Sequence, residues 1–249
     1  MEVLQSAALR PLWAGALYLL LLVVVGQVAW RVRRWLERRA TPTALRVRSW
    51  GGWAFWRRVA DLVLTLTYLF VGLLDGTFAA GDVGLIPLEI SGEWWWLLGL
   101  ELALVGWMAL LWGLYWRRCP RWRKGDGAWE EPTWGQMALQ VPSHEGRMAI
   151  VRAALIPLLG AYWGAWAAVV CLWLVSILNP LRRARLRTPS GRAFLYLGWA
   201  TDWLSALFFV LTGSLWVALL SRTIAYLFLR ALSGWLHRHR ATAGPRPGR

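Results

Sequence analysis

Long, uninterrupted apolar runs are the feature that most limits how this chain can fold. Leu12 to Trp30 contains no charged residue, and Trp94 to Trp116 contains only Glu101. A membrane-spanning helix needs about 20 mostly apolar residues. Lipid offers no hydrogen-bond partners, so the backbone of such a run must bond internally, as a helix does. We therefore expect an all-α, polytopic integral membrane bundle. We also expect the first run to remain as a helix and not to be a cleaved signal.

The apolar stretches give a first estimate of the number of spans. They lie at about 12–30, 59–80, 94–116, 149–178 and 193–232. The last stretch would be about 60 Å long as one helix, roughly twice the thickness of the hydrocarbon core. We expect it to break at Thr212-Gly213-Ser214 and to form two helices.

The distribution of charge predicts the orientation. Most of the 28 Lys and Arg residues lie in four segments: 31–58, 117–124, 180–192 and 230–249. Cytoplasmic loops of membrane proteins are enriched in Lys and Arg. The net charge of +15 therefore follows from topology, and we expect no nucleic acid partner.

One further crossing is needed to bring all four basic segments to the same side. The only candidate is Gly127 to about Val141, which makes about seven membrane segments. The N-terminus would then lie outside and the C-terminus in the cytoplasm of a cell-membrane protein. This crossing would draw Glu130 and Glu131 into the membrane. In the alternative, 127–141 lies flat on the surface with both carboxylates in water.

The pattern divides the chain into three regions. Residues 1–58 would form a transmembrane helix and a basic interfacial segment, 59–232 the membrane bundle, and 233–249 a basic disordered tail. Within the first region, 31–58 alternates Arg with Trp and other apolar residues. This composition suits binding to anionic lipid headgroups.

A short motif resembles a known family. Trp129-Glu130-Glu131-Pro132-Thr133-Trp134 is similar to the W-E-E-x-x-W signature of the CPBP family, the CAAX prenyl endopeptidases and bacteriocin-processing proteins. The resemblance covers about 94–232. It implies that the paired glutamates activate a water molecule for attack on a peptide bond. It also implies that two His and an Asn on later helices bind a metal or the developing oxyanion.

Most of these family positions are occupied by other residues in this chain. The resemblance places Gly135 where the family has Arg, Ala167 and Arg222 where it has His, and Tyr226 where it has Asn. Only Glu130 and Glu131 match. The resemblance therefore implies a degenerate member, with no metal and no cofactor.

The three histidines do not restore the missing groups. We expect His144 in a short outer loop, and His237 and His239 on the basic tail. None of them is then placed to replace a histidine inside the membrane.

Arg222 is the exceptional cation, because it lies in the middle of an apolar span. A charge at that depth is costly unless it faces the bundle interior and finds a partner. The candidate partners are Glu130, Glu131, Asp202, Glu101 and Asp75. We predict an ion pair of Arg222 with Glu130 or Glu131, at the position of the former catalytic centre.

Three functions remain open at this point. The first is a non-catalytic binding or scaffold subunit whose partner is another membrane protein, a peptide or a lipid. The second is an active intramembrane peptidase that uses Glu130 and Glu131. The third is a transporter or channel subunit whose polar path includes Asp202 and Glu101.

Overall fold

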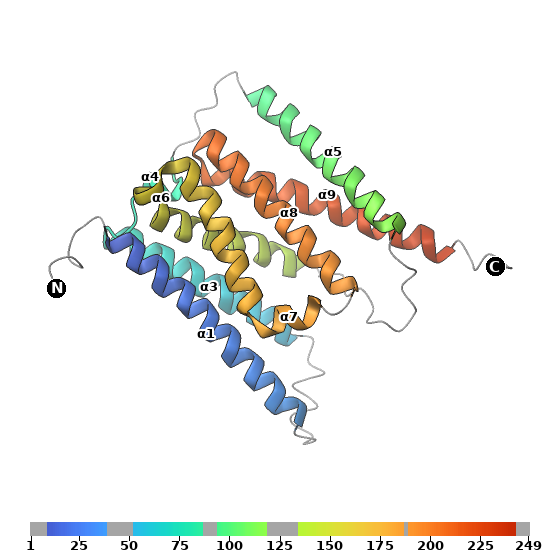
Figure 1. The fold of residues 1–249 in the computed structure, drawn as a ribbon, viewed down its shortest axis with the longest axis horizontal. Coiled ribbons are helices and arrows are strands. Elements are labelled where there is room, and N and C mark those ends of the chain that lie inside the picture. The colour runs from blue at the N-terminus through green and yellow to red at the C-terminus, as the bar shows by residue number, and fades with distance from the viewer. Residues whose placement is uncertain (1–8, 39–51, 87–93, 119–133, 187–188, 243–249) are drawn as a thin grey trace.

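The computed structural model describes residues 9–38, 52–86, 94–118, 134–186 and 189–242, and every regular element in this part is an α-helix (Figure 1). The helices are α1 (Arg10–Arg38), α3 (Gly52–Leu74), α4 (Ala80–Val83), α5 (Trp94–Arg118), α6 (Trp134–Leu178), α7 (Pro180–Leu186), α8 (Pro189–Thr212) and α9 (Leu215–Thr242). Five stretches are long and apolar enough to cross a membrane: Arg10–Leu36, Trp94–Tyr115, Ala138–Leu178, Leu195–Thr212 and Leu215–Leu232. The expected all-helical architecture with several candidate spans is confirmed at this level.

Helix α6 contains a bend that the sequence analysis did not predict. Gly160 has φ 75° and ψ 167°, so it divides the 45-residue helix into two arms, 134–159 and 161–178. Figure 1 shows the arms leaving the bend in different directions. They approach closely beside it, because a Cβ on Gly164 would lie 3.0 Å from the Cα of Ile156.

The position of this bend corrects the expected loop around His144. We predicted a crossing at 127–141 followed by a polar connection to 149–178. Instead the first arm of α6 is continuous from Trp134 to the bend. It passes through the polar residues of that connection because their side chains are bonded inside the bundle. Residues 127–133 lie outside the described part.

The predicted break at Thr212-Gly213-Ser214 is confirmed. Gly213 has φ 65° between α8 and α9, and the Ser214 N–H donates to Thr212 Oγ1 at 3.2 Å. The Leu215 N–H donates to the carbonyl oxygen of Gly84 at 2.8 Å. The segment after α4 therefore packs directly on the turn between the last two helices.

Helix α6 is the centre of the bundle. Helices α1 and α3 pack against it on one side, and α8 and α9 pack on each other and on α6 (Figure 1). Helix α5 lies on the outside, against α9. Large apolar side chains such as Phe70, Leu102 and Trp107 face outward, as expected for helices surrounded by lipid.

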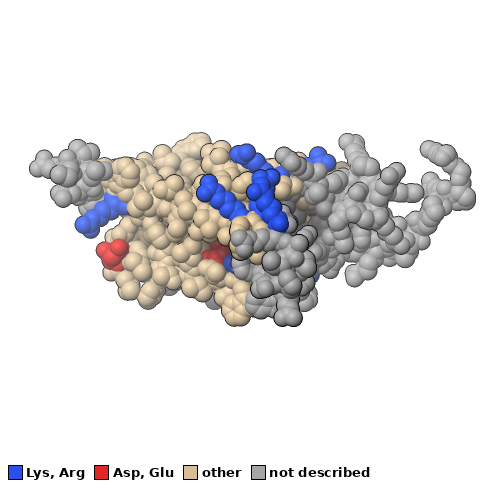
Figure 2. All heavy atoms as spheres, turned by 90° about the horizontal axis from the view of Figure 1, so that it is seen from below, with Lys and Arg blue, Asp and Glu red and all other residues tan. Residues whose placement is uncertain are grey.

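The helix ends that border the basic segments lie on the same side of the bundle, although the ends of α1 and α9 are well apart there (Figure 1). Figure 1 shows there the end of α1, the start of α3, α7 and the end of α9, whereas α4, the α6 bend and the turn before α9 lie at the other end. In Figure 2, several Lys and Arg side chains gather on one part of the face beside the grey segments.

Two expected boundaries shift. Helix α1 continues to Arg38 and α3 begins at Gly52, so part of the basic segment 31–58 is helical, while 39–51 lie outside the described residues. Helix α9 runs to Thr242. The first part of the tail 233–249, which we expected to be disordered, is therefore helical up to that residue.

The bend gives a first prediction. Gly160 has a backbone conformation that is almost exclusive to glycine and costs other residues about 1–3 kcal/mol. We expect Gly160→Ala to lower the thermal unfolding midpoint of the protein in detergent micelles. Gly99→Ala is the matched control, because a Cβ there meets nothing within 4 Å and alanine favours a helix. Equal midpoints for Gly160→Ala and the unchanged protein would show that the bend does not depend on glycine.

Candidate functional site: a buried ionic network beside an arginine-lined cavity

Four charged side chains are almost completely enclosed in the centre of the bundle. Arg152 is 0% exposed, Glu145 1%, Arg222 2% and Asp202 3%. Glu145 and Arg152 lie seven residues apart on the first arm of α6, which places them on the same face of that helix. Asp202 comes from α8 and Arg222 from α9. The network therefore ties together the three helices at the core.

Glu145 is held by two cations and one hydroxyl. Arg152 Nη2 donates to Glu145 Oε1 at 2.6 Å, and Ser205 Oγ donates to Glu145 Oε2 at 2.6 Å. Arg222 Nη1 lies 3.2 Å from Glu145 Oε2. The guanidinium carbon of Arg152 also lies 3.9 Å from the centre of the Phe209 ring. With this many donors around it, Glu145 is stabilised as a carboxylate.

Asp202 connects Arg222 to a histidine and a tryptophan. It forms an ion pair with Arg222 and accepts a hydrogen bond from Trp173 Nε1 at 3.0 Å. His144 Nε2 lies 2.8 Å from Asp202 Oδ1. Because a carboxylate can only accept, we assign the ring proton to Nε2. His144 is thus a member of the buried network.

A second ion pair joins α3 to α6. Asp61 forms an ion pair with Arg147, and Ser143 Oγ donates to Asp61 Oδ2 at 2.8 Å. Ser143 and Arg147 are four residues apart on α6 and so share one helix face. These bonds give Ser143 and Arg147 polar partners inside the bundle. Without such partners, burial of these side chains would be costly.

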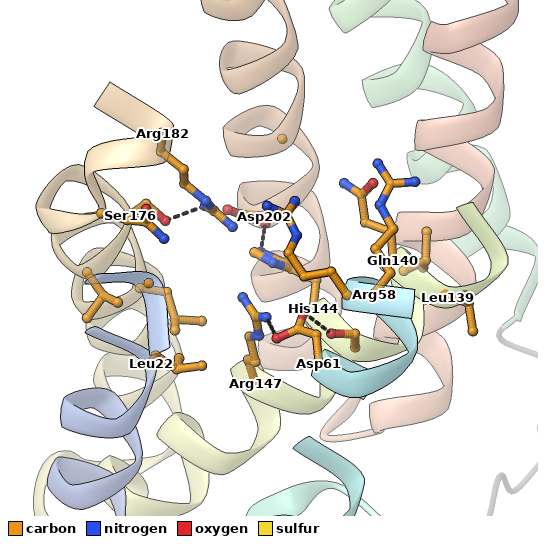
Figure 3. Close-up of a pocket in the computed structure, with 18 of the residues that line it drawn as sticks. Leu22, Arg58, Asp61, Leu139, Gln140, His144, Arg147, Ser176, Arg182 and Asp202 are labelled. Carbon is orange, nitrogen blue, oxygen red and sulfur yellow. Dashed lines mark hydrogen bonds and ion pairs between the residues drawn. The ribbon is translucent and has the colours of Figure 1, made fainter. Parts of the chain in front are cut away.

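A cavity of about 560 Å³ lies between these two groups. Its cations are Arg57, Arg58, Arg147, Arg182 and Arg222, and its acids are Asp61 and Asp202. Figure 3 shows Arg147 and Arg182 pointing toward the same space from opposite sides. The lining comes from 22–29, 57–64, 139–147, 172–182 and 195–202, with Arg222 and Tyr226. This places the cavity toward the end of the bundle that borders the basic segments.

Arg182 belongs to the short helix α7, where it is bonded to Ser176 Oγ. The pKa of Arg182 is lowered to about 10, mainly by burial; the neighbouring Arg147 contributes to this lowering and Asp202 opposes it. The side chain is therefore still cationic at neutral pH.

Some of the predicted site residues line the cavity, and others do not. Arg222 and Tyr226 line the cavity, whereas Gly135 and Ala167 do not. Glu130 and Glu131 lie outside the described residues, so their proposed ion pair with Arg222 stays a prediction. The partners of Arg222 in the described part of the chain are Asp202 and Glu145.

Two predictions about polar residues have a clear outcome. The outer-loop position expected for His144 is wrong, because the ring lies inside the bundle on Asp202. Asp202 lines the cavity. Glu101 does not: it is 4% exposed and accepts a hydrogen bond from Ser221 Oγ at 2.7 Å.

Sequence analysis missed Glu145, Arg147, Arg152 and Asp61, although a signal for two of them was present. Outside the four basic segments, the cations of the chain are Arg10, Arg147, Arg152 and Arg222. Three of these four residues belong to the buried groups described above. An arginine that does not belong to a basic loop was thus an indicator of the charged interior.

The chemistry available at this site is that of ion pairing and anion binding. Ser143 and Ser205 donate to Asp61 and Glu145, so these hydroxyls are not positioned as nucleophiles activated by His144. Among the described residues no three His, Cys, Asp or Glu side chains converge as metal ligands. Comparisons with protein-family models, curated proteins and solved structures give no match, so the site is interpreted from its own geometry.

The network gives a second prediction. Arg222→Met would leave Asp202 and Glu145 short of a cation, and removing one partner of a buried pair costs about 3–5 kcal/mol. Asp202→Asn alone should also be destabilising. We expect the double variant to lose clearly less stability than the sum of the single losses. The measurement is a double-mutant cycle of unfolding in micelles. Simple additivity would mean that the two side chains do not interact.

Proposed function

We propose that this chain is a seven-span membrane protein that binds an anionic ligand in the arginine-lined cavity and does not cleave peptide bonds. The observation that carries the proposal is the charge of the cavity. Its lining contains five arginines and two aspartates, so positively charged side chains outnumber negatively charged ones among the lining residues. Glu145 and Arg152, next to the cavity, cancel each other and leave this excess unchanged.

An excess of positive charge inside a membrane protein calls for a counter-charge. Removing charges from water costs several kcal/mol per ion unless they are paired. Arg57 is exposed and can be hydrated, but Arg182 is partly buried and is bonded to the neutral hydroxyl of Ser176. Arginine is also the side chain best suited to oxyanions, because its planar fork donates two parallel hydrogen bonds. A bound anion would supply the missing negative charge.

The proposed topology takes the two arms of α6 as two crossings and includes α3. With α1, α5, α8 and α9, this makes seven. All basic segments would then face the cytoplasm, with the N-terminus outside and the C-terminus inside the cell membrane. The cavity would accordingly lie in the cytoplasmic half of the bundle.

The proposed kinship with the CPBP family is compatible with a binding role. Two positions where that family has His and Asn are Arg222 and Tyr226 here, and both line the cavity. A guanidinium bound to two carboxylates does not act as a base. A cavity that once held a reacting group would thus have become a binding cavity. The same proposal includes a second role, in which the protein acts as a scaffold that binds another membrane protein.

Anion binding can be tested with inorganic phosphate and purified protein in maltoside micelles, which contain no phosphate. Loss of one charge-assisted hydrogen bond costs about 1.5–3 kcal/mol, so Arg182→Gln should weaken phosphate binding about tenfold or more in calorimetry. Arg183→Gln is the matched control. This exposed neighbour donates to the Ile177 carbonyl oxygen at 2.7 Å and is not part of the cavity lining. Binding that is equally affected by both variants would contradict the proposal.

The absence of peptidase activity is tested separately. Purified protein in vesicles should cleave a membrane-tethered peptide no faster than the Glu130→Gln variant does. The product is measured by mass spectrometry. Reproducible cleavage that disappears in Glu130→Gln would establish the peptidase alternative instead.

A further inference from the structure

The cavity has an apolar wall as well as a cationic one. Leu22 and Val25 of α1 and Leu172 and Val175 of α6 line it together with the arginines. Its volume of about 560 Å³ is typical of sites for small organic ligands. A small hydrated ion would leave this apolar wall without a partner.

Segments of both α1 and α3 line the cavity, and one of their lining residues lies partly on the outside of the bundle. Two hydrogen bonds join these helices away from the cavity: Tyr18 Oη to Thr65 Oγ1 at 3.0 Å and Tyr68 Oη to the Ala14 carbonyl oxygen at 2.6 Å. The cavity is lined by the next parts of both helices, 22–29 and 57–64. There Val25 is 44% exposed although it lines the cavity. A half-exposed apolar lining residue makes this side the candidate exit of the cavity toward lipid.

Several buried donors at the cavity have no acceptor among the described residues. They are Nε of Arg222, Nε of Arg147 and Nε1 of Trp199. All three side chains line the cavity, and they come from α9, α6 and α8. Buried donors of this kind normally have a partner. An acceptor with several oxygens could bond donors that come from different helices, whereas a planar carboxylate fits a single arginine fork best.

We infer that the ligand is a membrane amphiphile with a phosphate headgroup. The headgroup lies among Arg147, Arg182 and Arg222, and the apolar chain leaves the cavity between α1 and α3 beside Val25. This inference rests on the proposed anion-binding function and specifies its ligand class. It explains why the cationic pocket has an apolar wall that includes the half-exposed Val25.

The test compares three probes on the delipidated protein in maltoside micelles. Lysophosphatidic acid carries the headgroup and one chain, monoacylglycerol carries the chain alone, and inorganic phosphate carries the anion alone. We expect lysophosphatidic acid to bind at least tenfold more tightly than either of the other two. Native mass spectrometry and calorimetry measure the binding.

A blocking variant separates the chain from the headgroup. Val25→Trp should close the opening and weaken lysophosphatidic acid binding about tenfold, while inorganic phosphate binding stays unchanged. Val24→Trp is the matched control, because Val24 is 48% exposed on the same helix and does not line the cavity.

The possible outcomes distinguish the two proposals. If phosphate binds and depends on Arg182 but lysophosphatidic acid binds no more tightly, the amphiphile is excluded and the anion site remains. The same holds if Val25→Trp and Val24→Trp have equal effects. If neither phosphate nor lysophosphatidic acid binds, the proposed function itself fails.

Discussion

The ion pair of Arg222 with Asp202 and Glu145 is the interaction on which the interior of this protein depends. A guanidinium that is 2% exposed in an apolar bundle must be neutralised, and the two carboxylates come from α8 and α6. Their own remaining oxygens are satisfied by Arg152, Ser205, Trp173 and His144. The helices therefore pack in the one register that satisfies all these groups. Apolar packing alone would allow neighbouring registers, because lipid and protein interiors are similarly apolar.

Pairing of buried polar side chains also explains why α6 continues as a helix through its polar segment. Ser143, His144, Glu145 and Arg147 would be costly at this depth if they were unpaired. Each of them is bonded to a partner on another element or on α6 itself. The helix can then continue to Gly160, where the backbone conformation required by the bend costs glycine little.

The sequence predicted those features that depend on local composition. Apolar runs predicted helices, and Thr212-Gly213-Ser214 predicted the last break, because turn residues there interrupt a run too long for one span. The bend at Gly160 was missed because a polar segment some fifteen residues earlier looked like a better loop. His144 was misplaced for the same reason: its partner Asp202 lies 58 residues away in sequence. Pairing across helices leaves no local pattern, although Arg147 and Arg152 were unusual as cations outside the basic segments.

Arg222 belongs both to the buried ionic network and to the lining of the cationic cavity. Arg222 is bonded to Asp202 and Glu145 on one side and lines the cavity with its free Nε on the other. Its position is fixed by the carboxylates, so it pays little further conformational entropy to bind an anion. Arg152 also forms an ion pair with Glu145. Glu145 therefore neutralises Arg222 only in part, and the remaining positive charge of Arg222 could attract a ligand. The network that sets the helix register would therefore also prepare the cavity for the proposed anion.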